Sequence, residues 1–280
     1  FIHFHVCEKL EFVKHLKPSL TLFASLLAIS VYTSLDSVML GFINGDNAVG
    51  LYDMAVKAKT VTLSLINAIS GVLLPRLSYY VAQNARELYN ETLKKSIRII
   101  FMIAVPLTVL FEIEALDVII ILGGKEYIGA VPCMRIIMPI LLISGFSNIT
   151  GNQILIPHGL DKYYTKAVVC GAIVDVVLNI LLMPRYSIYG AALATLIAEC
   201  AQMLVQAYYS KSYLKERFDT VCMKRIILST MLAGIVVCVT KYIFNFHPFI
   251  NILLYSFAFL GIYGILFYIF YGRKVYELFS

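Results

Sequence analysis

The residues of this 280-residue chain that could do chemistry are polar side chains placed inside strongly apolar runs. Hydrocarbon excludes such groups unless they face protein or water, so each one marks a candidate functional position. Buried amides and hydroxyls suit sugar hydroxyls, whereas a cation suits a phosphate group. The candidates for lining a substrate path are Asp36, Asp53, Lys57, Ser64, Asn148, Asn152, Asp175, Asn179, Glu199, Gln202 and Gln206.

The predicted span 51–75 contains two lysines, Lys57 and Lys59. Lys57 follows Asp53 by four residues, which is the favourable order for a helical ion pair. Lys59 points about 160° away from Lys57 on an ideal helix, so the two lysines cannot serve one cavity without local distortion. Lys57 could reach outward to the interface, pair with Asp53 or Asp36, or face a wet cavity that holds an anionic substrate. We predict that it supplies positive charge on the outer half of a substrate path, with pairing to Asp53 or Asp36 as a compatible arrangement. Asp36 could instead be a carboxylate that reaches the nearby outer surface.

A second group of candidates shares one helical face. Glu199, Gln202 and Gln206 fall within a narrow arc of the run 189–210, beside an arc of glycine and alanine that suits close helix packing. The remaining arc is apolar. This division predicts a helix with one face toward water, one toward protein and one toward lipid, as in a bundle around a cavity.

Composition indicates the elements that must position these residues. The chain is 60% hydrophobic and only 14% charged, far from the balance of a soluble domain. Its apolar runs of roughly 20 residues predict an all-α integral membrane protein rather than a β-barrel. Eight transmembrane helices are expected, at about 19–42, 51–75, 97–122, 132–156, 166–184, 189–210, 226–244 and 250–271.

The distribution of basic residues predicts the orientation of these helices. With the predicted spans, 17 Lys and Arg residues fall on one side and four on the other. The richer side is expected to be cytoplasmic, with both ends of the chain there. Because the basic residues sit between spans, the net charge of +6 is explained without a nucleic-acid partner.

Known catalytic patterns are missing from the sequence. It contains no G-x-S-x-G, H-E-x-x-H or nucleotide-binding glycine motif. The six cysteines form no C-x-x-C pair, so neither a disulfide framework nor a metal site is expected. We predict a protein that is not an enzyme, has no cofactor, and relies on a gradient for any transport.

The spans fall into three expected parts. Residues 1–18 read as an amphipathic linker, residues 19–212 as a six-helix transporter lobe, and residues 213–280 as a basic loop followed by a two-helix extension. The last two spans contain almost no ionisable residues, and Lys241 is expected to reach the membrane interface. Because the chain begins with Phe1 rather than Met, we expect it to be part of a longer protein.

Several stretches resemble a known family. They are YTSLDSVMLGF with NAVGLYDMAVKAK near the start, then ILIPHGLDKYY and VLNILLMPRYSIYGAALATLIAE. These resemble the C-terminal lobe of Wzx-type polysaccharide flippases, of the multidrug/oligosaccharidyl-lipid/polysaccharide exporter superfamily. The resemblance implies translocation of undecaprenyl-diphosphate-linked oligosaccharide across the bacterial inner membrane, by alternating access between two six-helix lobes. It also implies membrane lipid and a missing N-terminal lobe of the same protein as partners.

Two other functions stay open at the level of sequence. A relative in the same superfamily could export drugs or a cell-wall precursor, and a membrane-embedded carboxylate such as Asp36 would suit cation coupling there. A membrane enzyme of polysaccharide assembly, such as a polymerase, is the other alternative. Polymerases of that kind usually need a large outer loop, whereas every outer loop expected here is short.

Overall fold

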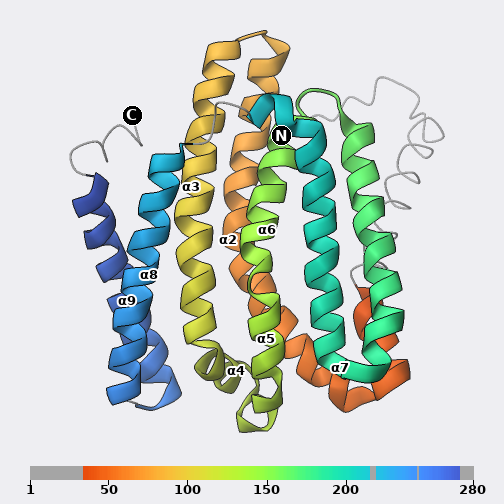
Figure 1. The fold of residues 1–280 in the computed structure, drawn as a ribbon, viewed down its shortest axis with the longest axis vertical. Helices are drawn as coiled ribbons and strands as arrows, with labels where there is room; N and C mark the ends of the chain where they lie inside the picture. Colours follow the sequence, from red (N-terminus) through yellow and green to blue (C-terminus); the bar gives the residue numbers. More distant parts are fainter. Residues whose placement is uncertain (1–33, 215–218, 245, 272–280) are drawn as a thin grey trace, which may run out of the picture.

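The computed structural model describes residues 34–214, 219–244 and 246–271, and every regular element in these ranges is a helix (Figure 1). The predicted all-α fold is therefore confirmed. The expected linker 1–18 and the beginning of the first span lie outside the described residues, while residues 34–44 are helical. The other elements are α2 Asp46–Ala82, α3 Arg86–Ile113, α4 Ala115–Gly123, the 3₁₀ helix η1 Lys125–Ala130, α5 Val131–Ile137, α6 Ile140–Ser147, the π-helix η2 Asn148–Leu155, α7 Asp161–Leu214, α8 Thr220–Ile243 and α9 Pro248–Tyr271.

The lengths and compositions of the helices are those of membrane-spanning segments. Among the described residues, α2, α3, α7, α8 and α9 are each long and apolar enough to cross a bilayer, and one bent helix pair raises the number to six. Large apolar side chains cover the outside of the bundle; Phe42, Val72 and Phe257 are each at least three-quarters exposed. A soluble protein rarely exposes so much apolar surface, whereas lipid covers it without cost.

The helix α7 contains the fifth and sixth predicted spans. Its 54 residues are interrupted at Ser187, whose φ of 48° is left-handed. The chain reverses there, and Figure 1 shows the two halves of α7 side by side. A Cβ on Gly190 would lie 2.5 Å from the carbonyl oxygen of Leu182, so only glycine allows this turn to close so tightly. In the first half of α7, a Cβ on Gly171 would lie 3.3 Å from the carbonyl oxygen of Ala198, an alanine of the arc for which close packing was predicted.

The fourth span is broken. Its two parts, Lys125–Ile137 and Ile140–Leu155, meet at an angle of 41° next to Pro139, a residue that commonly bends helices. The second part ends in the π-helix η2, a rare geometry that is frequent at functional sites. Within η2 Gln153 is fully buried, where it accepts a hydrogen bond from Ser96 (2.6 Å) and donates one to Ser70 (3.3 Å). These bonds tie η2 to α2 and α3.

The third span is shorter at its outer end than predicted. A continuous helix over 97–122 was expected, but α3 ends at Ile113 and α4 begins separately at Ala115. At the other end α2 and α3 extend well beyond the predicted spans and join through a short turn at Asn84, whose φ is 54°. These helices form the hairpin that projects at the top of Figure 1.

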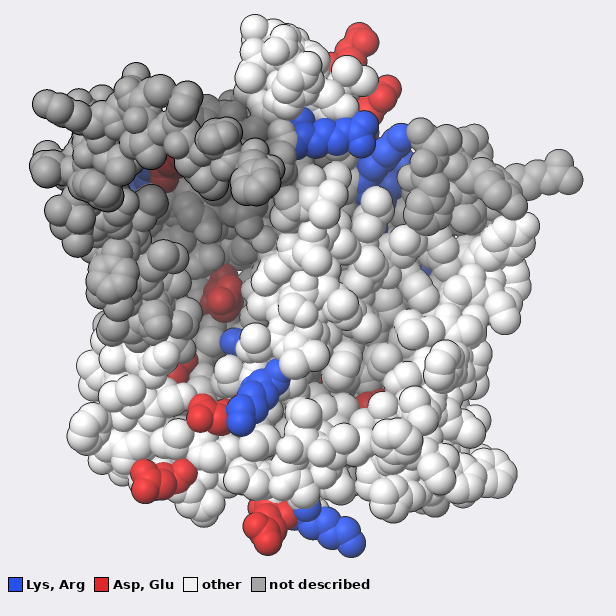
Figure 2. Space-filling view, turned by 180° about the vertical axis from the view of Figure 1, so that it is seen from behind, with Lys and Arg blue, Asp and Glu red and all other residues white. Residues whose placement is uncertain are grey.

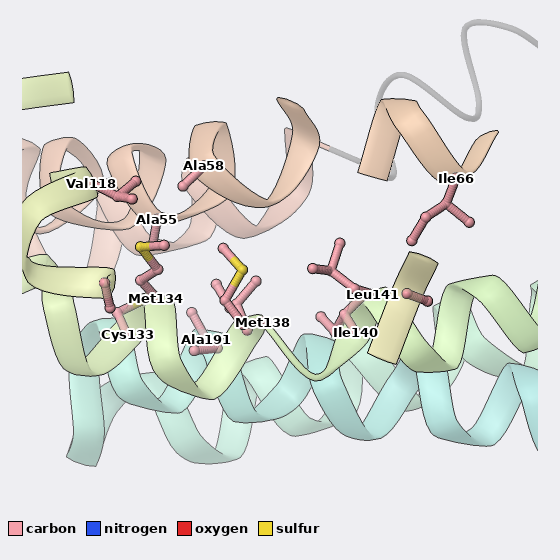
Figure 3. Close-up of a cluster of buried hydrophobic side chains, with 14 of the residues drawn as sticks. Ala55, Ala58, Ile66, Val118, Cys133, Met134, Met138, Ile140, Leu141 and Ala191 are labelled. Carbon is pink, nitrogen blue, oxygen red and sulfur yellow. The ribbon is translucent and has the colours of Figure 1, made fainter. Parts of the chain in front are cut away.

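Close packing holds α2, the α4–α6 region and the second half of α7 together. Figure 3 shows small residues of α2, Ala55 and Ala58, facing Met134 and Met138 of the broken span. Alanine lets the α2 backbone approach closely, and flexible methionine fills the remaining gaps. This packed interior fixes α2 against the elements that carry most of the predicted site residues.

The two C-terminal helices form a hairpin on the opposite side of α3 from α7 (Figure 1). An ion cluster anchors them: Lys241 of α8 lies 3.0 Å from Glu114 and 2.5 Å from Asp117, and Asn251 of α9 donates a hydrogen bond to Asp117 (3.2 Å). Both acids are buried. Lys241 therefore has two carboxylate partners within the protein, and its expected position at the membrane interface stays a prediction.

Candidate functional site: a polar path between α2, η2 and α7

A buried carboxylate joins the segment 34–44 to α2 and to both halves of α7. Asp36 is 8% exposed and accepts hydrogen bonds from Tyr52 (2.9 Å), Thr195 (3.0 Å) and Asn179 (2.7 Å). These partners come from α2, the second half of α7 and its first half. Asp36 therefore does not reach the outer surface, and the alternative considered for it is excluded.

A second carboxylate completes this buried cluster. Asp175 is 2% exposed and lies one helical turn before Asn179, whose side-chain nitrogen donates to it (3.1 Å) as well as to Asp36. Among the described residues, Oδ1 of Asp175 and Oδ1 of Asn179 have no hydrogen-bond partner. Unpaired buried acceptors are costly, by about 1–3 kcal/mol each, and a proton or a bound cation would satisfy them. We call Asp36, Asp175, Asn179, Tyr52 and Thr195 the acidic cluster.

A polar cavity lies near the acidic cluster. It has a volume of about 140 Å³ and is open on one side. On the face of the molecule seen in Figure 2, a few acidic and basic side chains lie recessed among uncharged ones. Ser144 donates a hydrogen bond to Glu199 (3.4 Å), and Thr150 donates one to the buried Gln206 (3.0 Å). The cavity is lined by Leu63, Asn67, Ser144, Ser147, Asn148, Asn152, Tyr164, Glu199, Gln202 and Gln206.

Three amides form a chain along one wall of the polar cavity. Asn152 donates to Asn148 (2.6 Å), which in turn donates to Asn67 of α2 (2.9 Å). Each amide keeps further donor or acceptor capacity for a ligand. Neutral groups of this kind match sugar hydroxyls, which also donate and accept.

The two lysines of α2 occupy different surroundings. Lys57 is exposed, whereas Lys59 is half-buried and within electrostatic reach of both Asp175 and Glu199. The helical spacing correctly predicted opposite directions for the two lysines. It could not predict which direction was the interior.

The remaining candidates lie apart from the cavity. Asp53 accepts a hydrogen bond from Ser37 (2.7 Å), and the exposed Ser64 donates to the backbone of its own helix. No ion pair joins Lys57 to Asp53 or Asp36, three residues that the structure describes. The predicted pairing of Lys57 is therefore wrong in this structure, and its role in the path stays a prediction.

The structure thus divides the predicted site residues into three groups. Sequence reasoning missed Tyr52, which looks like an ordinary aromatic residue of a span, and Asn67, a polar residue that its position inside an apolar run could have indicated. Within the described ranges, no group of three or more His, Cys, Asp and Glu side chains is placed to hold a metal ion. The cavity contains Asn148, Asn152, Glu199, Gln202 and Gln206; the acidic cluster contains Asp36, Asp175 and Asn179; Asp53, Lys57 and Ser64 lie outside both.

The chain is similar to proteins named for polysaccharide biosynthesis and glycan transport. The profile of the family described as "Polysaccharide biosynthesis protein" matches residues 2–81. A "Putative O-antigen transporter" of Escherichia coli K12 is 28% identical over 64% of this chain and 43% of its own length. A "Probable low-salt glycan biosynthesis flippase Agl15" of Haloferax volcanii is 22% identical over 67% of this chain and 40% of its own length. The chain spans less than half the length of these relatives.

A solved structure shares the fold. "Lipid II flippase MurJ, inward closed conformation" superposes with a TM-score of 0.80 at 18% identity, covering 98% of this chain and 57% of the other. The chain is thus a multi-pass helical membrane protein, and it shares the fold of this flippase structure. The resemblance to Wzx-type flippases of the multidrug/oligosaccharidyl-lipid/polysaccharide exporter superfamily is confirmed by these comparisons.

Proposed function

We propose that the chain is the C-terminal lobe of a flippase that translocates undecaprenyl-diphosphate-linked oligosaccharide units for surface polysaccharide biosynthesis. The observation that carries this proposal is the polar cavity, where amides, hydroxyls and one carboxylate gather inside an otherwise apolar helical lobe. Its chemistry suits sugar hydroxyls, and the names of the relatives support the same substrate class. The path comprises the eleven predicted residues, with Asn67 added by the structure.

Translocation follows from alternating access between this lobe and an N-terminal lobe of the same protein. The open side of the cavity then faces the other lobe, and rocking of the two lobes exposes the bound sugars to each leaflet in turn. The packed contacts of α2 with the broken span let the lobe move as one body. The hairpin α8–α9 lies away from the cavity and forms an extension rather than part of the path.

The acidic cluster is the coupling site in this proposal. Two buried carboxylates, one shared amide and two unpaired acceptor oxygens suit a proton or an alkali cation. Thr195 of the cluster and Glu199 of the cavity are one turn apart on α7. Binding of a cation in the cluster can therefore change the position or charge of groups in the cavity. Cation-coupled export of drugs or of a cell-wall precursor would use the same cluster and remains the second candidate.

The decisive experiment measures surface glycan in a strain that lacks its own flippase and carries variants of the full-length parent. Glu199→Gln and Gln202→Ala are expected to reduce glycan display at matched membrane expression, whereas Ser229→Ala in α8 serves as a buried control outside the path. Unchanged display in both cavity variants would reject the proposed path. Drug efflux without glycan display would favour the second candidate.

Orientation in the bacterial inner membrane is tested separately. We propose that both ends of this chain are cytoplasmic, which puts the α2–α3 hairpin inside the cell and the Asp46 end of α2 outside. In a cysteine-free parent, a cysteine at the exposed Asp46 should react with an impermeant maleimide, and one at the exposed Glu87 should not. The reverse pattern would invert the proposed topology.

A further inference from the structure

Lys59 occupies an interior position on α2. It lies seven residues after Tyr52 and seven before Ile66, so all three share one helical face. Tyr52 is 2% exposed and Ile66 is fully buried. Because Lys59 is half-buried on this largely buried face, its charge needs compensation from groups of the protein or of a ligand.

The same face of α2 connects the two parts of the site. Tyr52, about 10 Å from Lys59 along the helix axis, donates to Asp36 of the acidic cluster. Leu63, about 6 Å away in the other direction, lines the polar cavity together with Glu199. The opposing surface of α7 repeats this order, with Thr195 in the cluster and Glu199 in the cavity one turn later. The position of Lys59 on α2 therefore lies between the two.

The charges around Lys59 do not balance. Three carboxylates surround this region, Asp36, Asp175 and Glu199, and Lys59 lies within electrostatic reach of the last two. It forms no contact ion pair with any of these three described residues. The other titratable groups nearby are Tyr52, Tyr164 and Cys133. One lysine is thus shared between two acidic sites and bound firmly to neither.

We propose that Lys59 is a tethered counter-ion that links the acidic cluster to the polar cavity. When the cluster is empty of added cations, the ammonium group is drawn toward Asp175. When a proton or an alkali cation occupies the cluster, Lys59 is released toward the cavity, where it meets the diphosphate of the substrate. This inference rests on the proposed function and adds to it the residue through which cation and anion binding are coupled.

Thermodynamic linkage between cation binding and anion binding allows this coupling to be measured. If a cation in the cluster strengthens anion binding in the cavity, then the anion must strengthen cation binding by the same factor. Removing the ammonium group should have two opposite effects. The acidic cluster should bind cations more tightly because its internal competitor is gone, and the cavity should bind anions more weakly.

The test uses the purified full-length parent in nanodiscs, with pyrophosphate as the anionic probe. Pyrophosphate binding is measured by calorimetry in NaCl, in choline chloride at the same ionic strength, and over a range of pH in choline chloride. In the wild type, Na⁺ or a lower pH should tighten pyrophosphate binding. In Lys59→Met, cation affinity should rise about tenfold, equivalent to about 1.4 kcal/mol, and pyrophosphate binding should weaken and lose its dependence on the cation.

Controls separate this role from a general loss of charge. Lys59→Arg should keep the coupling, and Lys125→Met, which removes a positive charge from an exposed turn, should behave as the wild type. Coupling that persists in Lys59→Met overturns the proposal, and so does a wild type whose pyrophosphate binding responds to neither Na⁺ nor pH. Glycan display is measured in parallel. If the parent displays glycan but Lys59→Met retains coupling, the proposed role of Lys59 is rejected while the proposed flippase function stands.

Discussion

Two regions of this lobe bury carboxylates, and they do so differently. At the C-terminal hairpin, Lys241 contacts Glu114 and Asp117 directly, and Asn251 adds a hydrogen bond from α9. In the acidic cluster, neither Asp36 nor Asp175 has a cationic partner at contact distance, and Oδ1 of Asp175 accepts no hydrogen bond. The first arrangement holds helices together. The second leaves acceptor oxygens that a proton or a cation from outside the protein can occupy.

The comparison gives a physical criterion for function in this fold. Removing one partner of a buried contact pair leaves an uncompensated charge, so such a pair is expected to matter for stability. Neutralising a carboxylate that has no cationic contact should leave the fold intact or make it more stable, while it removes whatever the charge attracts. Mutations in the two regions should therefore separate stability from transport.

The largest expected effect is at the hairpin. Lys241→Ala leaves Glu114 and Asp117 without their cation and should destabilise the protein by about 3–5 kcal/mol. Thermal unfolding in detergent measures this loss. The triple variant Lys241→Met, Glu114→Gln, Asp117→Asn removes all three charges and should recover most of the stability. If Lys241→Ala is as stable as the wild type, the proposed difference between the hairpin and the acidic cluster is contradicted.

The opposite behaviour is expected for Asp175→Asn. The substitution replaces one buried carboxylate by a neutral group of the same shape, so the unfolding temperature should be unchanged or higher. Glycan display by the full-length parent should fall more than tenfold, because the coupling charge is lost. A destabilised protein with normal transport per folded molecule would show that the acidic cluster is structural like the hairpin.

The turn within α7 offers a way to disturb one region alone. A Cβ at Gly190 would collide with the carbonyl group of Leu182, so Gly190→Ala should push the two halves of α7 apart at a cost of about 1–3 kcal/mol. Transport should decrease, since Asn179 and Thr195 sit on different halves. Gly264→Ala in α9, where nothing lies within 4 Å of the added Cβ, is the matched control.

A smaller effect is expected where one hydroxyl fixes an amide of the cavity. Thr150→Val removes the hydrogen bond that orients Gln206 while keeping the size of the side chain. The loss is worth about 1 kcal/mol, so transport should fall only a few-fold. Thr240→Val in α8, whose hydroxyl bonds to its own helix, should have no effect on glycan display.

Sequence alone was sufficient for the features that depend on local chemistry. Hydropathy predicted the apolar spans, and the 100° step of a helix grouped Glu199, Gln202 and Gln206, all of which line the cavity. Small residues around Gly190 predicted a close helix contact, which the turn of α7 confirms. The family resemblance likewise depended on continuous stretches such as the one that ends at Glu199.

Only the tertiary structure decided which charges meet. Lys241 is 127 residues from Glu114 and 124 from Asp117, and no local pattern connects them. Spacing placed Lys57 and Lys59 on different faces of α2, but the interior face depends on where the broken span and α7 pack. Helical periodicity gives directions relative to the axis of one helix. Burial and pairing depend on the neighbouring helices, which the sequence of that helix does not encode.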